Sequence, residues 1–416
     1  MNSRSAIGNP LSSVPTPTGG GILGGLAFIL ALLIYAIFSA PFPANPGMTE
    51  VLIAVLLILF VSLPTGIFVI SGGFTLYRRY DTVPMPLHLG FFVLLWLGLL
   101  NGGVIYRWDS TDILRDLIPC VYLFVPLLLL PAMNRSKLKW LSILPWLVAV
   151  MGVILSIRFY MEVRISPLDI GKMYYFDNFL YLPYDPSVSF AGVFLPIMAV
   201  HTWKSSNPLR WLSSLAMLIG GFLALGSLMA VAQRAPLGLA VLCFAVYFGL
   251  SSGRSVRKLL VILVIMIGAG MLAQEQISSS FDLLLSKQVN YGANGKTDEL
   301  AAVLQETSKS VYTLLLGIGW GGLFFDPTYM SEVSFTHSAF TFLLLKGGVI
   351  GLTVFLAYLS WISLKCLRRV NMNNLPYMLA AGVPIMIGLF FQPSFKTLSY
   401  GMLLTVLILK DKESIS

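Results

Sequence analysis

One histidine and a few basic residues are the side chains of this sequence that could carry out chemistry. His337 stands in "FTHSAF", where a polar segment gives way to a long apolar run. A neutral imidazole at such a boundary can take a proton near neutral pH, so His337 is a candidate general base. A lone histidine can also be a hydrogen-bonded structural residue, which is how we interpret His88 and His201, at other helix ends.

Arg234 is the basic residue whose position most needs an explanation. It lies in "MAVAQRAPLGL", a very short turn between two apolar runs. Charges at membrane depth cost roughly 2.5–3.5 kcal/mol each, so they need a partner, a water-filled cavity or a function. A guanidinium there can bind two acceptor oxygens with its planar fork. Two structural interpretations stay open: the side chain extends to the membrane interface, or it pairs with Asp112 or Asp116.

Segment 158–186 carries further candidates. Arg158 and Arg164 stand at its start and could bind an anion, or could extend to the interface or pair with Glu162. Aromatic side chains follow, which are typical of a membrane-interface belt but could also stack on sugar rings. The stacking candidates are Tyr174, Tyr175 and Tyr181.

The composition places these residues in an integral membrane protein. The 416 residues are 57% hydrophobic and 11% charged, whereas ordinary soluble domains carry about 25% charged residues. Runs of about 20 apolar residues predict membrane-spanning helices. We therefore predict an all-α polytopic membrane protein with about twelve spans, two of them short. The runs are 20–40, 50–71, 88–106, 113–131, 139–157, 187–202, 209–231, 235–251, 257–273, 338–362, 374–391 and 396–410.

The chain divides into blocks of helices and two long outward-facing loops. The N-terminal segment is polar and rich in Pro, Gly and Ser, which is typical of disorder. The first apolar run is too long for a cleaved signal and predicts an uncleaved anchor. The predicted order is a leader (1–19), five membrane helices (20–157), a first loop (158–186), four membrane helices (187–273), a long loop containing a helix (274–337), three membrane helices (338–410) and a tail (411–416).

The distribution of charge predicts the orientation. With twelve spans, both termini share one side, and that side holds 16 basic and three acidic residues of the chain's 27 and 18. Lys and Arg in short loops sort to the cytoplasm, so we expect cytoplasmic termini and both long loops outside. The net charge of +9 is then topogenic, and the sequence contains no nucleic-acid-binding motif.

The long loop contains an expected amphipathic helix in "GKTDELAAVLQETSKSVYTLLLGIGWGG". Thr297 suits the N-cap, and Asp298 and Glu299 suit the positive end of the helix dipole. Its predicted apolar face consists of Leu300, Val303, Leu304, Val311 and Leu314. Such a helix would lie on the membrane or on the helix bundle.

Two glycines after His337 predict a close helix contact. Gly348 and Gly351 are three residues apart, so on a regular helix they share a face. Their missing side chains let a neighbouring helix approach, which would fix how deep His337 lies. The outer-face segments contain no Asp-x-Asp pair or His/Cys cluster that would mark a metal site.

Two motifs resemble those of the O-antigen ligase and polymerase superfamily. The stretch "THSAFTFLLLKGGVIGL", after a Gly-x-Gly turn at Gly317 and Gly319, is similar to the pattern His-(Asn)-x-x-Leu-x-x-Leu-x-(Glu)-x-Gly-x-x-Gly-Leu. "AQRAPLG" matches the arginine motif of the superfamily at Arg234. Members are twelve-span glycosyltransferases of the bacterial envelope.

The sequence departs from the pattern at four positions. Ser338 stands in place of Asn, Thr341 in place of the first Leu, and Lys346 in place of Glu. The superfamily also has an arginine in the long loop, where this chain has none. Lys287 or Lys296 could replace it, as point charges rather than forks.

The resemblance implies a reaction. The donor is an undecaprenyl-pyrophosphate-linked glycan, and the acceptor is a sugar hydroxyl of lipid A–core. His337 would act as the base, and Arg234 would hold the pyrophosphate, assisted by Arg158 and Arg164, with Lys346 close by. Transfer would invert the anomeric centre without a metal ion or another cofactor. The protein would lie in the bacterial inner membrane among membrane lipids, its site facing the periplasm.

Two alternatives stay open. A polymerase shares every motif but uses the end of another glycan as acceptor. A secondary transporter or flippase would place polar residues near the membrane midplane, often on broken helices in repeated halves. We find no such repeat in the sequence.

Overall fold

The computed structural model describes residues 21–39, 47–71, 85–167, 178–202, 208–251, 278, 282, 296–327, 330–368 and 370–413. This part of the chain is helical apart from one antiparallel hairpin, β1 (Phe324–Asp326) with β2 (Ser331–Val333). The first half contains α1 (Ile22–Phe38), α2 (Met48–Val61), α3 (Leu63–Ile70), α4 (Met85–Leu99), the π-helix η3 (Leu100–Ile105), α5 (Ser110–Phe124), α6 (Pro126–Arg135), α7 (Trp140–Val163), the 3₁₀ helix η5 (Asn178–Tyr184) and α8 (Pro186–Thr202). The second half contains α9 (Pro208–Ala230), α10 (Arg234–Ser251), α13 (Lys296–Thr307), α14 (Val311–Leu316), α15 (Ala339–Arg368), α16 (Leu375–Phe390), the 3₁₀ turn η7 (Pro393–Lys396) and α17 (Leu398–Glu413).

Several of these helices are long and apolar enough to cross a membrane. Among the described residues there are five, or six if the bent pair α5 and α6 is one span. The five are Met85–Ile105, Trp140–Val163, Leu209–Ala230, Arg234–Ser251 and Ala339–Arg368. The chain is thus helical with several potential spans, and the predicted twelve are not confirmed. The predicted run 257–273 lies outside the described residues.

Breaks within two predicted spans explain part of the difference between the predicted twelve spans and those in the structure. The predicted span 50–71 is interrupted at Ser62, which has a φ of 68° and separates α2 from α3. The guanidinium of Arg135 donates to the Val61 carbonyl at 2.9 Å and to Thr65 Oγ1 at 3.0 Å. These bonds satisfy a carbonyl that the break removes from the helix ladder. The predicted span 113–131 is likewise two helices, α5 and α6, bent by 50°.

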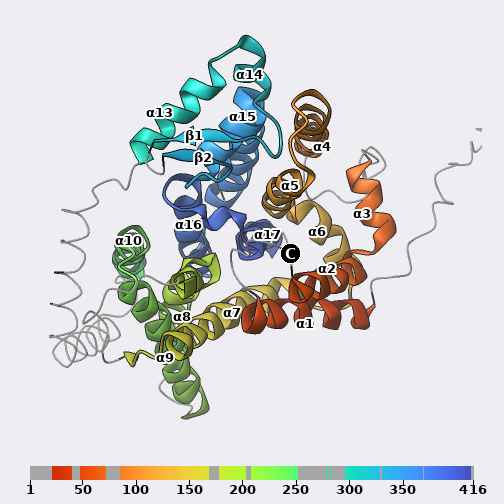
Figure 1. The fold of residues 1–416 in the computed structure, drawn as a ribbon. Helices are drawn as coiled ribbons and strands as arrows, with labels where there is room; N and C mark the ends of the chain where they lie inside the picture. Colours follow the sequence, from red (N-terminus) through yellow and green to blue (C-terminus); the bar gives the residue numbers. More distant parts are fainter. Residues whose placement is uncertain are drawn as a thin grey trace, which may run out of the picture.

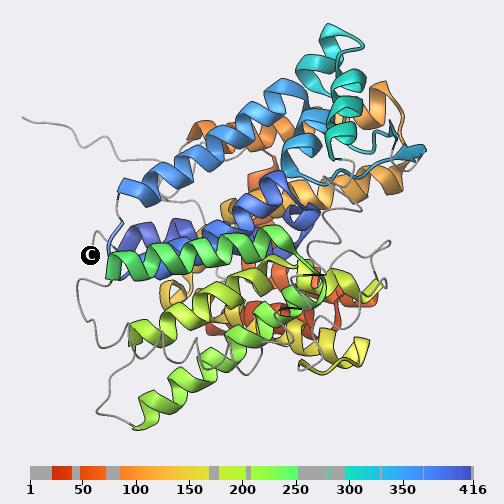
Figure 2. The same cartoon turned by 90° about the vertical axis from the view of Figure 1, so that its left-hand side faces the viewer.

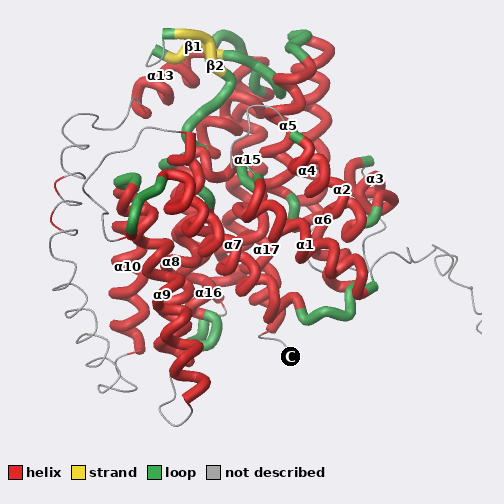
Figure 3. Tube along the Cα trace, turned by 60° about the horizontal axis from the view of Figure 1, so that its bottom comes forward, coloured by secondary structure: helices red, strands yellow, loops and turns green. Residues whose placement is uncertain are grey.

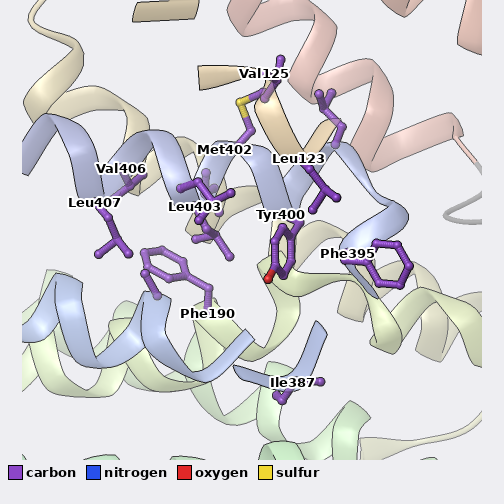
Figure 4. Close-up of a cluster of buried hydrophobic side chains, with 14 of the residues drawn as sticks. Leu123, Val125, Phe190, Ile387, Phe395, Tyr400, Met402, Leu403, Val406 and Leu407 are labelled. Carbon is purple, nitrogen blue, oxygen red and sulfur yellow. The ribbon is translucent and has the colours of Figure 1, made fainter. Parts of the chain in front are cut away.

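The core of the molecule is built around α17. Its segment from Leu398 to Leu409 is buried along its whole length, as expected for a helix that is apolar all round. Figure 4 shows Tyr400, Leu403 and Leu407 of this helix facing Phe190 of α8. Because α17 contacts α5, α6, α7, α8, α15 and α16, it holds together segments from both halves of the chain.

The elements of the predicted long loop gather at one end of the bundle. In Figure 1, α13, α14 and the β-hairpin lie beside the first turns of α15. Figure 2 shows the long helices running in a broadly common direction, with α13 and α14 at one end. In Figure 3 the hairpin lies at that same end. Elements from distant parts of the chain therefore meet around His337, just before α15.

The loop helix differs from the prediction. It is two helices, α13 and α14, and α13 begins at Lys296 rather than after an N-cap at Thr297. Of the predicted apolar face, Val303 is buried, whereas Leu304 is 46% exposed and Val311 is 74% exposed, so the face as a whole does not pack on the helix bundle. The buried side chains of α13 are those of Glu299, Val303 and Thr307. Hydrogen bonds between Glu299 and the start of α15 hold the side of α13 that carries these three residues toward the bundle.

Helix α15 is kinked where the turn "GIGWGG" docks on it. Gly348 has a φ of 62°, which interrupts the helix. The Leu345 and Lys346 carbonyls accept hydrogen bonds from the turn, from Ile318 N–H at 2.9 Å and from Gly319 N–H at 3.0 Å. The turn thus replaces donors that a straight helix would have supplied.

Gly317 in the turn and Gly351 in α15 are needed for two different reasons. Gly317 has a φ of 71°, and a Cβ there would lie 2.4 Å from the Lys346 backbone. A Cβ on Gly351 would lie 2.9 Å from Leu94 Cδ2 in α4, so Gly351 permits a helix contact. Because Gly348 is the kink itself, it does not share a regular helix face with Gly351.

Candidate functional site

A large cavity joins residues from most of the molecule. Its volume is about 1820 Å³, above the roughly 300–1,000 Å³ of ordinary small-molecule sites. Side chains from α2, α3, α5, α6, α10 and α13 line it, as do the segment before α15 and the turn between α16 and α17. His337, Arg234 and Lys296, three of the predicted site residues, all lie on its wall.

His337 forms the most distinctive contact of the cavity. Its Nδ1 makes a hydrogen bond to Glu299 Oε2, and its backbone N–H donates to both carboxylate oxygens at 3.1 Å. The imidazole is 24% exposed, and the Glu299 side chain is 3% exposed. A ring that donates from Nδ1 to a carboxylate keeps its lone pair on Nε2. This arrangement can orient the ring as a general base.

Residues at the start of α15 hold the acid in place. The Thr341 hydroxyl donates to Glu299 Oε1 at 2.8 Å, and Ser338 Oγ accepts from Thr341 N–H at 3.1 Å. Burial raises the pKa of Glu299, but the hydrogen bonds and electrostatic interaction with His337 and the hydrogen bond from Thr341 outweigh burial and lower the pKa. Glu299 is therefore ionised near neutral pH. Ser338 and Thr341, both departures from the superfamily pattern, thus support the His337–Glu299 pair.

Four cations line the same cavity, and one of them, Arg115 of α5, is paired with Asp112. Arg234 lies at the first position of α10, Lys296 at the start of α13, and Lys396 at the end of η7. Burial lowers the pKa of Lys296, and the Arg234 charge lowers it further, so these two groups act on each other. Clustered cations of this kind can bind an anionic group such as a phosphate.

Another part of the cavity wall is mostly apolar. It is formed by α2, α3, α5 and α6, the helices of the two broken pairs, and its charged side chains are Glu50, Arg115 and Asp116. Several of its side chains are also open to the outside of the bundle: Val51 is 51% exposed, Ile58 47% and Ile67 58%. One cavity therefore combines a cationic region with an apolar region that reaches the surface of the helix bundle.

Lys346 does not line the cavity. Its ammonium is fully buried and pairs with Asp116 Oδ2 at 2.6 Å, and it also donates to the Gly322 carbonyl. Asp116 Oδ2 accepts a further bond from Gly321 N–H at 2.7 Å. Because these groups already satisfy it, Lys346 holds the turn in place and is not positioned to bind a ligand. Its place inside an apolar run did not reveal this.

The two arginines of the first loop also lie away from the cavity lining. Arg158 bonds to Glu162 at 2.7 Å and to the carbonyls of Ala36 and Ser39 at 3.3 and 2.9 Å. Arg158 therefore forms the ion pair with Glu162 that the sequence left open, and it also binds carbonyls at the end of α1. Arg164 ends α7 with a φ of 56° and is exposed. The structure brings neither side chain to His337.

The structure describes only some of the aromatic and loop residues that were predicted for the site. Tyr174, Tyr175 and Lys287 lie outside the described residues. Tyr181 lines the cavity, and its ring centroid is 6.0 Å from that of Tyr184. The structure does not pair Arg234 with Asp112 or Asp116. Instead, Asp112 pairs with Arg115 and Asp116 pairs with Lys346.

Two cavity residues were missed from the sequence. Glu299 was interpreted only as a helix-dipole partner, since nothing local connects it to His337. Lys396 was overlooked, although it stands beside an apolar run, in "QPSFKTLSY", as Arg234 does. Applying the Arg234 argument to every run end would have found Lys396 but not its surroundings.

Within the described ranges, no three His, Cys, Asp or Glu residues lie close enough together to hold a metal ion. In comparisons with known proteins, no family model and no curated protein sequence matches this chain.

Proposed function

We propose that this protein is a membrane glycosyltransferase of the O-antigen ligase type. It would move a glycan from undecaprenyl pyrophosphate to a sugar hydroxyl of lipid A–core at the outer face of the bacterial inner membrane. The observation that carries the proposal is the His337–Glu299 pair, on the wall of a cavity that also contains Arg234, Lys296 and a long aliphatic wall.

The residues fit the demands of this reaction. The acceptor hydroxyl must lose a proton as it attacks, and His337 held by Glu299 is suited to take it. The departing pyrophosphate carries negative charge, which Arg234 and Lys296 can stabilise as the glycosidic bond breaks. Attack from the side opposite the pyrophosphate would invert the anomeric centre. The cations can neutralise the leaving group, so the chemistry does not require a metal ion.

The aliphatic half of the cavity supports a lipid donor. A polyprenyl chain needs an apolar path, and the exposed side chains of α2 and α3 lie where this path would reach the membrane. The sugar and pyrophosphate would then lie near His337, while the hydrocarbon chain remains among aliphatic side chains. A transporter would instead need polar groups through the midplane, whereas the cations of this cavity collect near the loop elements α13 and η7.

The test uses purified protein with a lipid-pyrophosphate glycan. One reaction contains lipid A–core as acceptor, and a second contains excess donor alone. Transfer only in the first reaction supports the ligase, and chain growth in the second supports the polymerase alternative. No product in either reaction would contradict the proposal and favour transport.

His337→Ala is the decisive variant. Loss of a general base typically reduces the rate 10²–10⁴-fold, so we expect a rate loss of about that size. His201→Ala is the matched control, because His201 pairs with Tyr247 and neither residue lines the cavity. Near-full activity of the His337 variant would remove this residue from the mechanism.

A further inference from the structure

The turn between α16 and α17 contains a cation that the proposed mechanism does not use. Lys396 lines the cavity, and its Nζ lies 5.6, 5.7 and 5.5 Å from the ring centroids of Phe335, Phe342 and Phe395. Among the described residues, no carboxylate lies within ion-pair distance of it. Aromatic faces attract a cation but do not accept its N–H bonds as an oxyanion does.

The side-chain amide of Gln233 is a second donor on this wall. The Gln233 side chain is 3% exposed and lines the cavity beside Arg234. Its Oε1 accepts from Gln392 Nε2 at 3.4 Å. Its Nε2 is buried, and no acceptor for it lies among the described residues. Buried donors are almost always paired in folded proteins, so an unpaired amide at a cavity wall indicates a ligand with acceptor atoms.

The turn between α16 and α17 connects these donors to one of the cations already described, Lys296. Lys296 lies over the Phe391 ring at 5.8 Å, next to Gln392 in sequence, and Gln392 bonds to Gln233. Lys396 follows four residues later on the same turn. Glu299 acts electrostatically on both lysines, and Asp116, which also lines the cavity, acts on Lys396.

We propose that Lys396 Nζ and Gln233 Nε2 form an additional oxyanion subsite, which binds a phosphate or carboxylate group of a substrate. This inference rests on the proposed function, in which an anionic substrate enters this cavity. The oxyanion has two possible sources: a phosphate of the lipid donor, or an acidic sugar of the glycan. Both supply oxygen acceptors to an ammonium and an amide donor.

Binding measurements test the subsite without requiring catalysis. Purified full-length protein is titrated with inorganic pyrophosphate and, separately, with glucuronate. We expect Lys396→Met to weaken binding of one of these probes about tenfold or more, since a charge-assisted hydrogen bond is lost. A loss for pyrophosphate assigns the subsite to the donor, and a loss for glucuronate alone assigns it to an acidic sugar.

The matched variants separate charge from packing. Lys396→Met keeps side-chain bulk against the three rings, and Lys396→Arg keeps the charge and should retain affinity within a few-fold. Gln233→Glu is nearly isosteric and should weaken binding of the same probe, because its carboxylate repels an anion. Lys365→Met is the control, because Lys365 lies over the Trp361 ring at 4.6 Å and does not line the cavity.

Three outcomes would overturn the subsite. Wild-type protein could bind neither probe, Lys396→Met could bind both as wild type does, or Lys365→Met could weaken binding equally. If Lys396→Met does not fold, Gln233→Glu and Lys396→Arg carry the same test, with melting temperature as the check on folding. The transfer assay stands apart: its failure with intact, Lys396-dependent anion binding would refute the proposed reaction and leave the subsite.

Discussion

Two pairs of basic and acidic side chains along α15 differ in what surrounds them. His337 and Glu299 meet just before the helix, where the imidazole is 24% exposed to the cavity. Lys346 and Asp116 meet at the kink, where the lysine side chain is fully buried and the acid is 5% exposed. In the first pair the basic group faces a cavity, and in the second it is satisfied by the fold.

The difference teaches how to separate a site from a scaffold. Both pairs join segments far apart in the chain, and both involve a residue of the motif that resembles the superfamily pattern. Only the partners and the exposure distinguish them. A buried pair whose acceptors are protein groups serves assembly, while a partly exposed base oriented by a buried acid is available for chemistry.

Removing the acid of the exposed pair should have the largest effect. We expect Glu299→Gln to reduce transfer about 10²–10⁴-fold, because the orienting carboxylate of His337 is lost. Combined with His337→Ala, it should cause no further loss, since Glu299 acts through the imidazole. Transfer rates of the two single variants and the double variant check this. Additive losses would show that Glu299 acts independently and would break the comparison.

Removing the base of the buried pair should affect stability instead. Lys346→Met leaves Asp116 buried without its cation, which we expect to cost about 3–5 kcal/mol of unfolding free energy. Denaturant unfolding of the purified protein in detergent measures this change. The double variant Lys346→Met with Asp116→Leu should recover much of it, and Lys365→Met serves as control. A loss below about 1 kcal/mol would show that the pair is not structural.

The pH dependence of anion binding should sharpen the contrast between Lys396 and the buried pair. Burial lowers the pKa of Lys396 to about 8, with Asp116 and Glu299 opposing the shift and Lys346 and Arg115 adding to it. The ammonium is therefore present below about pH 8 and is lost above it, so affinity should fall as pH rises through this value.

Titrations of inorganic pyrophosphate between about pH 7 and pH 9 measure that fall. Lys396→Arg should remove the part of the pH dependence that Lys396 causes, because arginine stays protonated in this range. The difference between wild type and this variant cancels the titration of pyrophosphate itself. Identical pH profiles for the two proteins would exclude Lys396 as the titrating group. A bound anion favours the ammonium, so the midpoint should move upward as pyrophosphate concentration increases.

The smallest expected effect lies on the scaffold side. Ser310 Oγ accepts from Thr313 N–H at 3.0 Å and caps α14, which leads into the docked turn. Ser310→Ala should lower the unfolding free energy by about 1 kcal/mol. The transfer rate at a temperature where the protein stays folded should not change. A larger effect on the rate than on stability would connect α14 directly to the site.

The sequence predicted much of the helical fold and part of the site. Apolar runs give helices wherever the described residues cover them, although breaks at Ser62 and between α5 and α6 divide two of the predicted spans. Arg234 and His337 were selected because basic groups beside apolar runs need a reason, and Lys296 because it could replace the loop arginine of the superfamily; all three line one cavity. Lys346 was selected by the same rule and lies in the scaffold.

Local sequence by itself determined which segments are apolar and helical and which polar side chains stand at their ends, because burial preference and helix propensity act over a few residues. Only the tertiary structure decided which carboxylate each base meets. Glu299 reaches His337 because α13 packs against α15, and Asp116 reaches Lys346 because α5 is held beside α4 and α17, which themselves pack on α15. Electrostatic and hydrogen-bond energies depend on separation in space and on desolvation, and the packing of helices sets both.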